Sequence, residues 1–198
     1  MKTSYSLEWL IDAYEDGVPL KYLYFWGNTA KKDEVSKACF SQWYDSPFTI
    51  KGVTYKTSEH WMMAQKALLF DDKETFERIV NCMKPGEAKD LGRTIKNFNE
   101  EVWKANRYEI VITGNIHKFN HNRQIGTFLL ETKNRILVEA SPIDTIWGVG
   151  LSHDSDAIKS LYQWRGENLL GFALMETRDF LNKHGFFNEL EDIIPTPY

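Results

Sequence analysis

Apolar residues recur at helical spacing in six segments of this chain, whereas only short runs carry the pattern of β-strands. The predicted helices lie near residues 6–14, 58–70, 85–95, 99–119, 121–131 and 168–185. The predicted strands are 22–26, 135–140 and a hairpin over 47–55, and the longest irregular loops are 27–46 and 141–156. These elements predict an α+β fold class, a mostly helical single domain around a small β-sheet.

Composition limits the class of protein. A chain of 198 residues with 42% hydrophobic residues can bury one core. Its net charge of -4 argues against the basic field that non-specific binding to a phosphate backbone requires. Glu8 and Asp12 interrupt the N-terminal region that would be apolar in a signal peptide, and no apolar run is long enough to span a membrane. We therefore expect a cytoplasmic protein with no membrane partner.

The segment 57–70, TSEHWMMAQKALLF, combines a strongly apolar helix with charged side chains. Glu59, Met63 and Lys66 fall on one helical face, where an acid and an amine could line a cleft. Alternatively, Glu59 is an acid in the first turn that the helix dipole favours, and Lys66 is a surface residue that extends its amine into water. The helix alone leaves both interpretations open.

The loop 141–151, SPIDTIWGVGL, places an acid and an aromatic ring among glycines. Gly148 and Gly150 allow tight turns beside Trp147, and such loops often hold ligands. In the alternative interpretation, Trp147 covers the edge of the core and Asp144 caps a turn.

Common catalytic motifs are missing from the sequence. His117 and His121 could share a helical face as metal ligands, but no Cys or carboxylate nearby completes a metal site. Cys39 and Cys82 fit no disulfide framework or redox motif. The sequence contains no HExxH, GxSxG, Walker A or GxGxxG pattern. The groups left for chemistry are carboxylates, tryptophans and one lysine.

Five segments, taken in order, resemble the YbiA-like family, also called NADAR. They are CFSQWYDSPFTIKGVTYKTSEHWMMAQKALLF, AKDLGR, VWKANRYEIVITGNIHKF, LLETKNRILVEASPIDTIWGVGL and NLLGFALMETRDFL, and they cover roughly residues 39–182. The resemblance implies a single YbiA-like domain over 1–198 with its core at about 22–183. It also implies hydrolysis of an N-glycosidic bond without a metal or redox cofactor.

The resemblance further implies roles for single residues. Glu59, Asp144 and Lys66 become the candidate catalytic residues. The candidate substrate-binding residues are Phe40, Ser41, Trp43, Tyr44, Trp103, Trp147 and Gly148, and the positive charge of Arg107 adds that residue as a further candidate. Gln42 stands where the family usually has Asn, and His121 where it has Gln. Both differences concern the choice of substrate more than the reaction.

These residue types suit cleavage of a ribosyl C1–N bond. The transition state resembles an oxocarbenium ion, which the carboxylates of Glu59 and Asp144 would stabilise. Lys66 offers a second route, in which its amine attacks the opened sugar and forms a Schiff base. Tryptophans 43, 103 and 147 would stack on a planar base, and Arg93, Arg107 and Lys118 are candidates for holding a phosphate.

The leading functional hypothesis is therefore an N-glycosidase that acts on a small phosphoribosyl compound, such as an early intermediate of riboflavin biosynthesis. The second hypothesis keeps the reaction but removes ADP-ribose from a base or nucleotide, such as ADP-ribosylated guanine. Nucleic acid would then be a partner only as a modified substrate. A hypothesis of another class is a non-catalytic sensor that binds ADP-ribose or a nucleotide. The sequence carries no signal for the oligomeric state.

Overall fold

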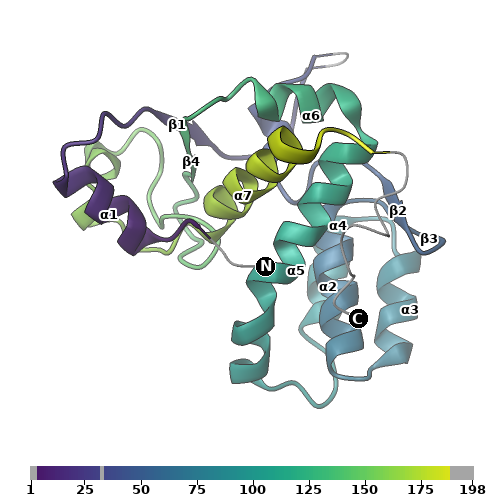
Figure 1. Ribbon diagram of the computed structural model, residues 1–198. Helices are drawn as coiled ribbons and strands as arrows, with labels where there is room; N and C mark the ends of the chain where they lie inside the picture. Colours follow the sequence, from purple (N-terminus) through teal and green to yellow (C-terminus); the bar gives the residue numbers. More distant parts are fainter. Residues whose placement is uncertain (1–3, 32–33, 188–198) are drawn as a thin grey trace.

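The computed structural model describes residues 4–31 and 34–187 (Figure 1). Its helices are α1 (Leu7–Glu15), α2 (Ser58–Leu69), α3 (Lys73–Asn81), α4 (Pro85–Gly92), α5 (Glu100–His121), α6 (Arg123–Leu130) and α7 (Leu169–His184). Its strands are β1 (Tyr22–Phe25), β2 (Phe48–Ile50), β3 (Val53–Tyr55) and β4 (Ile136–Glu139). Three 3-10 helices complete it, η1 (Lys37–Phe40), η2 (Asp156–Lys159) and η3 (Leu161–Gln163). The predicted α+β class, mostly helical with little strand, is confirmed.

The strands form two separate pairs instead of one small sheet. β1 and β4 run parallel, in register from Tyr22 opposite Ile136 to Phe25 opposite Glu139. β2 and β3 form the predicted antiparallel hairpin. Its turn residues, Lys51 and Gly52, have φ values of 47° and 79°, the left-handed conformation that two-residue hairpin turns require.

The centre of the molecule is α5, a helix of 22 residues whose segment 110–120 is buried throughout. α2 and α7 both pack against α5, and α7 also packs on β4 (Figure 1). A helix that is covered on all sides also buries polar side chains, and in α5 these include Asn115, His117 and Lys118. Asn99 caps its first turn by accepting a hydrogen bond from the backbone N–H of Val102.

The contact between α2 and α5 depends on one close approach. The indole N–H of Trp61 in α2 donates to the backbone carbonyl of Ile110 in α5, at 2.8 Å. Gly114, one turn further along α5, leaves room for the ring, because a Cβ atom at this position would lie 2.2 Å from the indole. Small residues of this kind let a helix accept a large aromatic side chain.

Two parts of the chain differ from the sequence prediction. α3 was not predicted, although Asp72 caps its first turn and Ile79 is fully buried. The predicted loop 27–46 contains the buried 3-10 helix η1, and its residues 32–33 lie outside the described part. The predicted loop 141–156 is irregular up to the start of η2.

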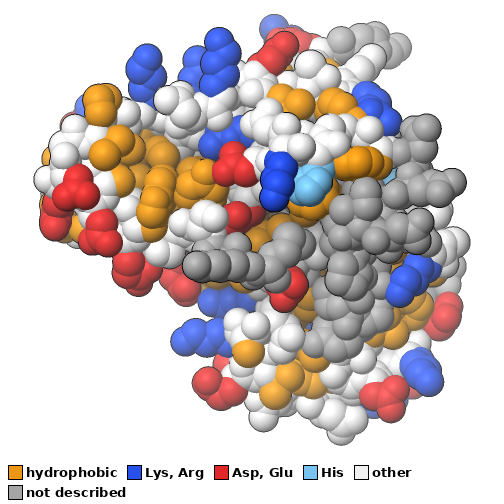
Figure 2. Space-filling model, viewed as in Figure 1, with side chains coloured by type: hydrophobic (Ala, Val, Ile, Leu, Met, Phe, Trp, Pro, Cys, Tyr) orange, Lys and Arg blue, Asp and Glu red, His pale blue; other side chains and the backbone are white. Residues whose placement is uncertain are grey.

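Charges of both signs are interspersed on the face of the molecule that Figure 2 shows, and apolar side chains gather over its α1 end. Tyr14, Val18 and Tyr162 are among the exposed apolar residues of this region. Across residues 4–31 and 34–187, no helix is both long enough and apolar enough to cross a lipid bilayer.

We expect Gly114→Ala to lower the free energy of unfolding by about 1–3 kcal/mol, because the added methyl group collides with the Trp61 indole. Urea denaturation followed by tryptophan fluorescence would measure the change. Gly86→Ala is the matched control, since a Cβ at this helical position meets its nearest atom at 3.6 Å. Equal stability of the two variants would show that the contact between α2 and α5 tolerates a side chain at 114.

Candidate active site

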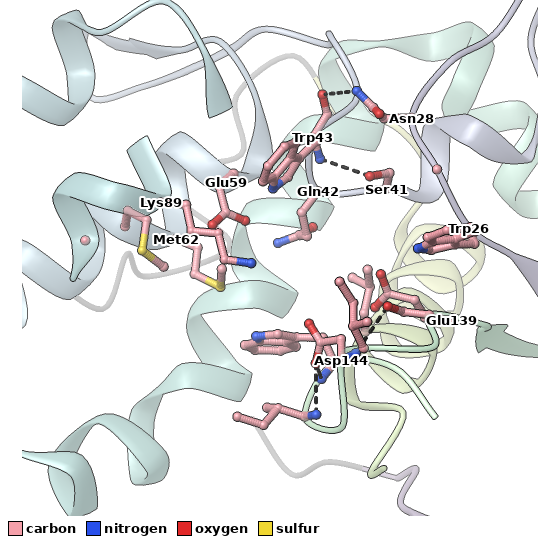
Figure 3. A pocket seen from close by; sticks show the side chains of 18 of the residues that line it. Trp26, Asn28, Ser41, Gln42, Trp43, Glu59, Met62, Lys89, Glu139 and Asp144 are labelled. Carbon is pink, nitrogen blue, oxygen red and sulfur yellow. Dashed lines mark hydrogen bonds between the residues drawn. The ribbon is translucent and has the colours of Figure 1, made fainter. Parts of the chain in front are cut away.

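A cavity of about 720 Å³ opens between α2, α4, the turn 41–43 after η1, the end of β4 and the loop that follows it (Figure 3). Charged and aromatic side chains from distant parts of the sequence share its wall. The acids are Glu59, Glu139 and Asp144, the cations are Lys66, Lys89 and Arg93, and the tryptophans are Trp26, Trp43, Trp103 and Trp147.

Glu59 enters the cavity from the first turn of α2. The side chain of Thr57 caps this turn by accepting a hydrogen bond from the backbone N–H of His60. The backbone N–H of Glu59 donates to the carbonyl of Gln42 at 3.0 Å, which ties the helix start to the turn 41–43. Glu59 is only 3% exposed, so its carboxyl group faces the cavity and not bulk water.

Burial raises the pKa of Glu59 from its ordinary value to about 7, because the ionised form loses its hydration. The positive charge of Lys89 and a hydrogen bond from the Trp43 side chain oppose this effect. The negative charge of Asp144 raises the pKa further. Glu59 therefore exchanges its proton near neutral pH, which is the range a general acid or base needs.

Asp144 lies in the cavity wall and also caps a turn of its own loop. The two interpretations of this loop, a ligand-holding loop and a capped turn, are therefore compatible. The Oδ1 of Asp144 accepts hydrogen bonds from the backbone N–H groups of Ile146 and Trp147, at 2.9 and 2.8 Å. These bonds fix Trp147 beside the cavity. Asp144 and Glu59 come from separate elements, yet their charges influence each other.

Lys66 lies in the same wall of the cavity, on a face of α2 that points away from the core. Its Nζ donates to the carbonyl of Gly92 at 2.9 Å and lies 4.1 Å from the ring centroid of Phe98. The ring of Trp103 is 5.5 Å away. Burial lowers the pKa of Lys66, since the charged amine is partly removed from water, and a nearby Glu100 opposes this.

Glu139 is a cavity residue that the sequence analysis missed. It is the last residue of β4, and its Oε2 is inaccessible to solvent and has no hydrogen-bond partner among the described residues. Burial and the negative charges of Asp144 and Glu59 raise the pKa of Glu139 to about 8, while Lys89 opposes them. One signal could have identified it, because sites often form at the carboxyl ends of parallel strands.

Of the three cations predicted to hold a phosphate, only Arg93 lines the cavity. Lys89 of α4 is a cavity residue that the sequence analysis did not name, and its Nζ lies 5.8 Å from the Trp43 ring centroid. Arg93 lines the cavity but pairs with Asp90 at 2.7 Å. Arg107 pairs with Glu167 at 3.3 Å, away from the cavity wall.

Lys118 is fully buried behind the turn 41–43, and its Nζ donates to the carbonyl of Ser41 at 2.9 Å. Burial lowers the pKa of Lys118 to about 7. It therefore supports the turn from behind and does not reach the space where a phosphate would lie.

Seven of the predicted site residues meet in the cavity wall, namely Ser41, Trp43, Glu59, Lys66, Trp103, Asp144 and Trp147. The other four lie outside it. Phe40 packs in the core against Phe25 and Phe128, Tyr44 faces Lys118, and Arg107 bonds to Glu167. Gly148 passes behind the strand end, where a Cβ atom would lie 2.8 Å from the Glu139 carbonyl oxygen.

His117 and His121 lie on one face of α5, with ring centroids 5.9 Å apart. His117 is 1% exposed, and burial lowers its pKa to about 4. In the described part of the chain, no group of three His, Cys, Asp or Glu side chains is arranged to hold a metal ion.

Residues 24–182 match the sequence model of the NADAR domain. The chain belongs to the NADAR family. N-glycosidase R617 of Acanthamoeba polyphaga mimivirus is 41% identical over 164 residues, which cover 80% of this chain and 95% of that relative. N-glycosidase YbiA of Escherichia coli strain K12 is 30% identical over 142 residues, which cover 72% of this chain and 80% of YbiA.

The fold agrees with this NADAR assignment. The NMR structure of E. coli YbiA superposes with a TM-score of 0.68 at 25% sequence identity, covering 85% of this chain and 89% of that one. The resemblance inferred from the five sequence segments is confirmed. So is the predicted enzyme class, and the NADAR chain is a hydrolase that acts on N-glycosyl bonds.

The raised pKa values predict how stability depends on pH. In the unfolded chain Glu59 and Glu139 lose their protons near pH 4.5, whereas in the folded protein they keep them up to about pH 7 and 8. His117 and Lys118, whose pKa values are lowered, act in the opposite direction. At Glu59 and Glu139 the folded state binds more protons between these limits, and the contribution of these two groups to stability falls as the pH rises through them. We expect Glu139→Gln to flatten this fall, as measured by urea unfolding from pH 5 to pH 9.

The control for this experiment is Glu131→Gln, which changes an exposed glutamate near the end of α6. It should leave the slope of stability against pH as in the parent protein. A Glu139→Gln variant whose slope of stability against pH equals that of the parent protein would contradict the burial of an ionisable proton at Glu139 in the cavity.

Proposed function

We propose that this chain hydrolyses the bond between ribose C1 and a base nitrogen in a phosphoribosyl compound, such as an early intermediate of riboflavin biosynthesis. One observation carries the proposal. Glu59 and Asp144, from α2 and from the loop after β4, line one cavity together with tryptophans 43, 103 and 147. Acids around a sugar and aromatic rings around a base are what cleavage of an N-ribosyl bond requires.

The acids supply the electrostatic part of the reaction. As the C1–N bond lengthens, positive charge grows on the ribose ring, and a carboxylate in a partly desolvated cavity stabilises that charge strongly. Glu59 can hold a negative charge there, because Lys89 and Trp43 favour its ionised form. In that form it can accept a proton from an attacking water molecule.

The tryptophans supply the binding surface. Stacking of a planar base on an aromatic ring contributes about 1–3 kcal/mol per contact in nucleic acid binding proteins. Trp103 is 8% exposed and Trp43 is 37% exposed, so the rings reach from the interior of the cavity to its mouth. A base stacked on one of the rings that line the cavity would place C1 near the acids.

The cations favour a phosphorylated substrate. Lys66, Lys89 and Arg93 lie in the wall on the α2 and α4 side, and Lys89 has no ion-pair partner within 4 Å among the described residues. A phosphate on the ribose would give Lys89 a direct ion-pair partner. This assignment replaces Arg107 and Lys118, which the sequence had suggested.

A second substrate class is favoured by the mouth of the cavity. Trp26 and Ile143 line it and are 55% and 88% exposed, an unusual exposure for large apolar side chains. A second planar group, such as the adenine of ADP-ribose joined to a guanine base, could cover them. A pure sensor of ADP-ribose is disfavoured, because three acids would repel an anionic ligand unless they served a reaction.

The deciding experiment is incubation of the protein with a panel of N-ribosyl compounds, followed by identification of released bases by mass spectrometry. The panel contains the phosphoribosyl intermediates of riboflavin biosynthesis, NAD and ADP-ribosylated guanosine. Release from the first group alone supports the leading proposal, and release from the last supports the second. Binding without release from any compound would favour a sensor.

We also place the protein in the cytoplasm.

Glu59→Gln should abolish release of the base, because the amide can neither carry the negative charge nor accept a proton. We expect kcat/KM to fall by at least about 10²–10⁴-fold with little change in the circular dichroism spectrum. Glu101→Gln, on the exposed first turn of α5, is the matched control. Near-normal turnover by Glu59→Gln would remove Glu59 from the mechanism.

Lys66 gives the mechanism a second route. Its amine can take the place of the departing base at C1 and form a Schiff base with the opened sugar, which water then hydrolyses. If this route operates, sodium borohydride added during turnover should reduce the Schiff base and leave the sugar attached to Lys66. Peptide mass spectrometry would detect it. Full activity with no trapped adduct would show that water attacks C1 directly.

A further inference from the structure

The carboxyl group of Glu139 is held in the cavity by its backbone. Its N–H donates to the side chain of Asn168 at 2.9 Å, and its carbonyl accepts from the N–H of Val149 at 3.0 Å. These bonds fix the end of β4 from two sides. The side chain itself lacks such support, since Oε2 has neither solvent contact nor a partner in the described part of the chain. A buried carboxyl left unpaired in a cavity is a sign of function.

Glu59 and Glu139 approach the cavity from opposite sides, one from α2 and the other from the end of β4 (Figure 3). Their surroundings differ in charge. The ionised form of Glu59 is favoured by Lys89, by Arg93 and by the hydrogen bond from Trp43. The groups that act on Glu139 are two acids, Asp144 and Glu59, and only one cation, Lys89.

When two acids share one cavity, the first to ionise makes the second hold its proton more tightly. The surroundings make Glu59 the first to ionise and Glu139 the second. Near neutral pH these surroundings favour the carboxylate form at Glu59 and the carboxylic acid form at Glu139, on opposite sides of the cavity.

We propose that the carboxylic acid of Glu139 is the general acid of the reaction and donates its proton to the nitrogen of the departing base. This assignment rests on the proposed N-ribosyl hydrolase function and settles which side of the cavity receives the base. The base lies toward the β4 side, next to Trp147 and the loop that Asp144 holds. The water molecule lies toward α2.

The step balances without any further reactant. The electron pair of the C1–N bond moves to nitrogen, which takes the proton of Glu139. Glu59 accepts a proton from water as the hydroxyl group bonds to C1. Glu139 ends ionised and Glu59 protonated, and one proton passed between them through solvent restores both. Asp144 keeps the acid form of Glu139 by its negative charge and positions Trp147 through its backbone bonds.

The test compares Glu139→Gln with Glu59→Gln on two probes. One is the best phosphoribosyl substrate from the panel, whose base must be protonated as it leaves. The other is 4-nitrophenyl β-D-ribofuranoside 5-phosphate, whose nitrophenolate leaves without a proton. We expect Glu139→Gln to lower kcat/KM about 10²–10⁴-fold on the first probe and less than tenfold on the second. Glu59→Gln should lower both, and Glu131→Gln neither.

Each outcome decides the assignment. An equal loss on both probes, or no loss on either, would overturn the role of Glu139 and leave the proposed function in place. A parent protein that releases no base from any compound of the panel would instead overturn the proposed function, and this role with it.

A second measurement covers the case in which Glu139→Gln fails to fold. The side-chain carboxyl signals of ¹³C-labelled glutamate in the parent protein would be followed by NMR from pH 4 to pH 9. Glu59→Gln and Glu131→Gln assist their assignment. Among the buried carboxyls, one that keeps its proton well above neutral pH and shifts when Glu59 is replaced supports the proposal. If every glutamate ionises below pH 6, the proposal is overturned.

Discussion

The hydrogen bond from the Trp61 indole to the Ile110 carbonyl, across the gap that Gly114 leaves, sets the position of α2 on α5. A buried indole N–H needs a partner, so this bond and the surrounding packing fix the helix in both rotation and depth. Glu59 is only two residues from Trp61, and its place in the cavity follows directly. α2 is apolar where Trp61 packs against α5, and it is charged where Glu59 and Lys66 line the cavity. The packing of the apolar side thus positions the charged side.

The cavity carries an electrostatic cost that the rest of the fold must sustain. Three carboxyl groups share it, and two of them are shielded from water. Burial of an unpaired polar group costs free energy, which folding recovers elsewhere, in the packing of α5 with α2 and α7. The same desolvation moves the protons of Glu59 and Glu139 into the neutral range. The cost in stability and the raised pKa values of these two acids thus have one physical origin.

Sequence periodicity predicted the α+β class, the hairpin and every α-helix of the described residues except α3, a helix of nine residues with few buried side chains. The sequence proposed Glu59, Lys66 and Asp144 as candidates, and all three line the cavity, but it did not show how deeply each is buried. Glu139 escaped because a single acid at the end of an apolar strand has no periodicity of its own. Arg107 and Lys118 were assigned to a phosphate because a sequence shows a charge but not its partner. In the folded protein Arg107 pairs with Glu167, and Lys118 donates a hydrogen bond to the carbonyl of Ser41.

The parallel pairing of β1 with β4 joins parts of the chain that are far apart in sequence. Trp26 follows one strand directly and Glu139 ends the other, so the side of the cavity that lies opposite α2 depends on this pairing. Closing so long a loop is entropically expensive, and contacts of this kind slow folding. Catalytic competence should consequently emerge late during refolding, after the helices have formed, and no fragment lacking either strand would retain it.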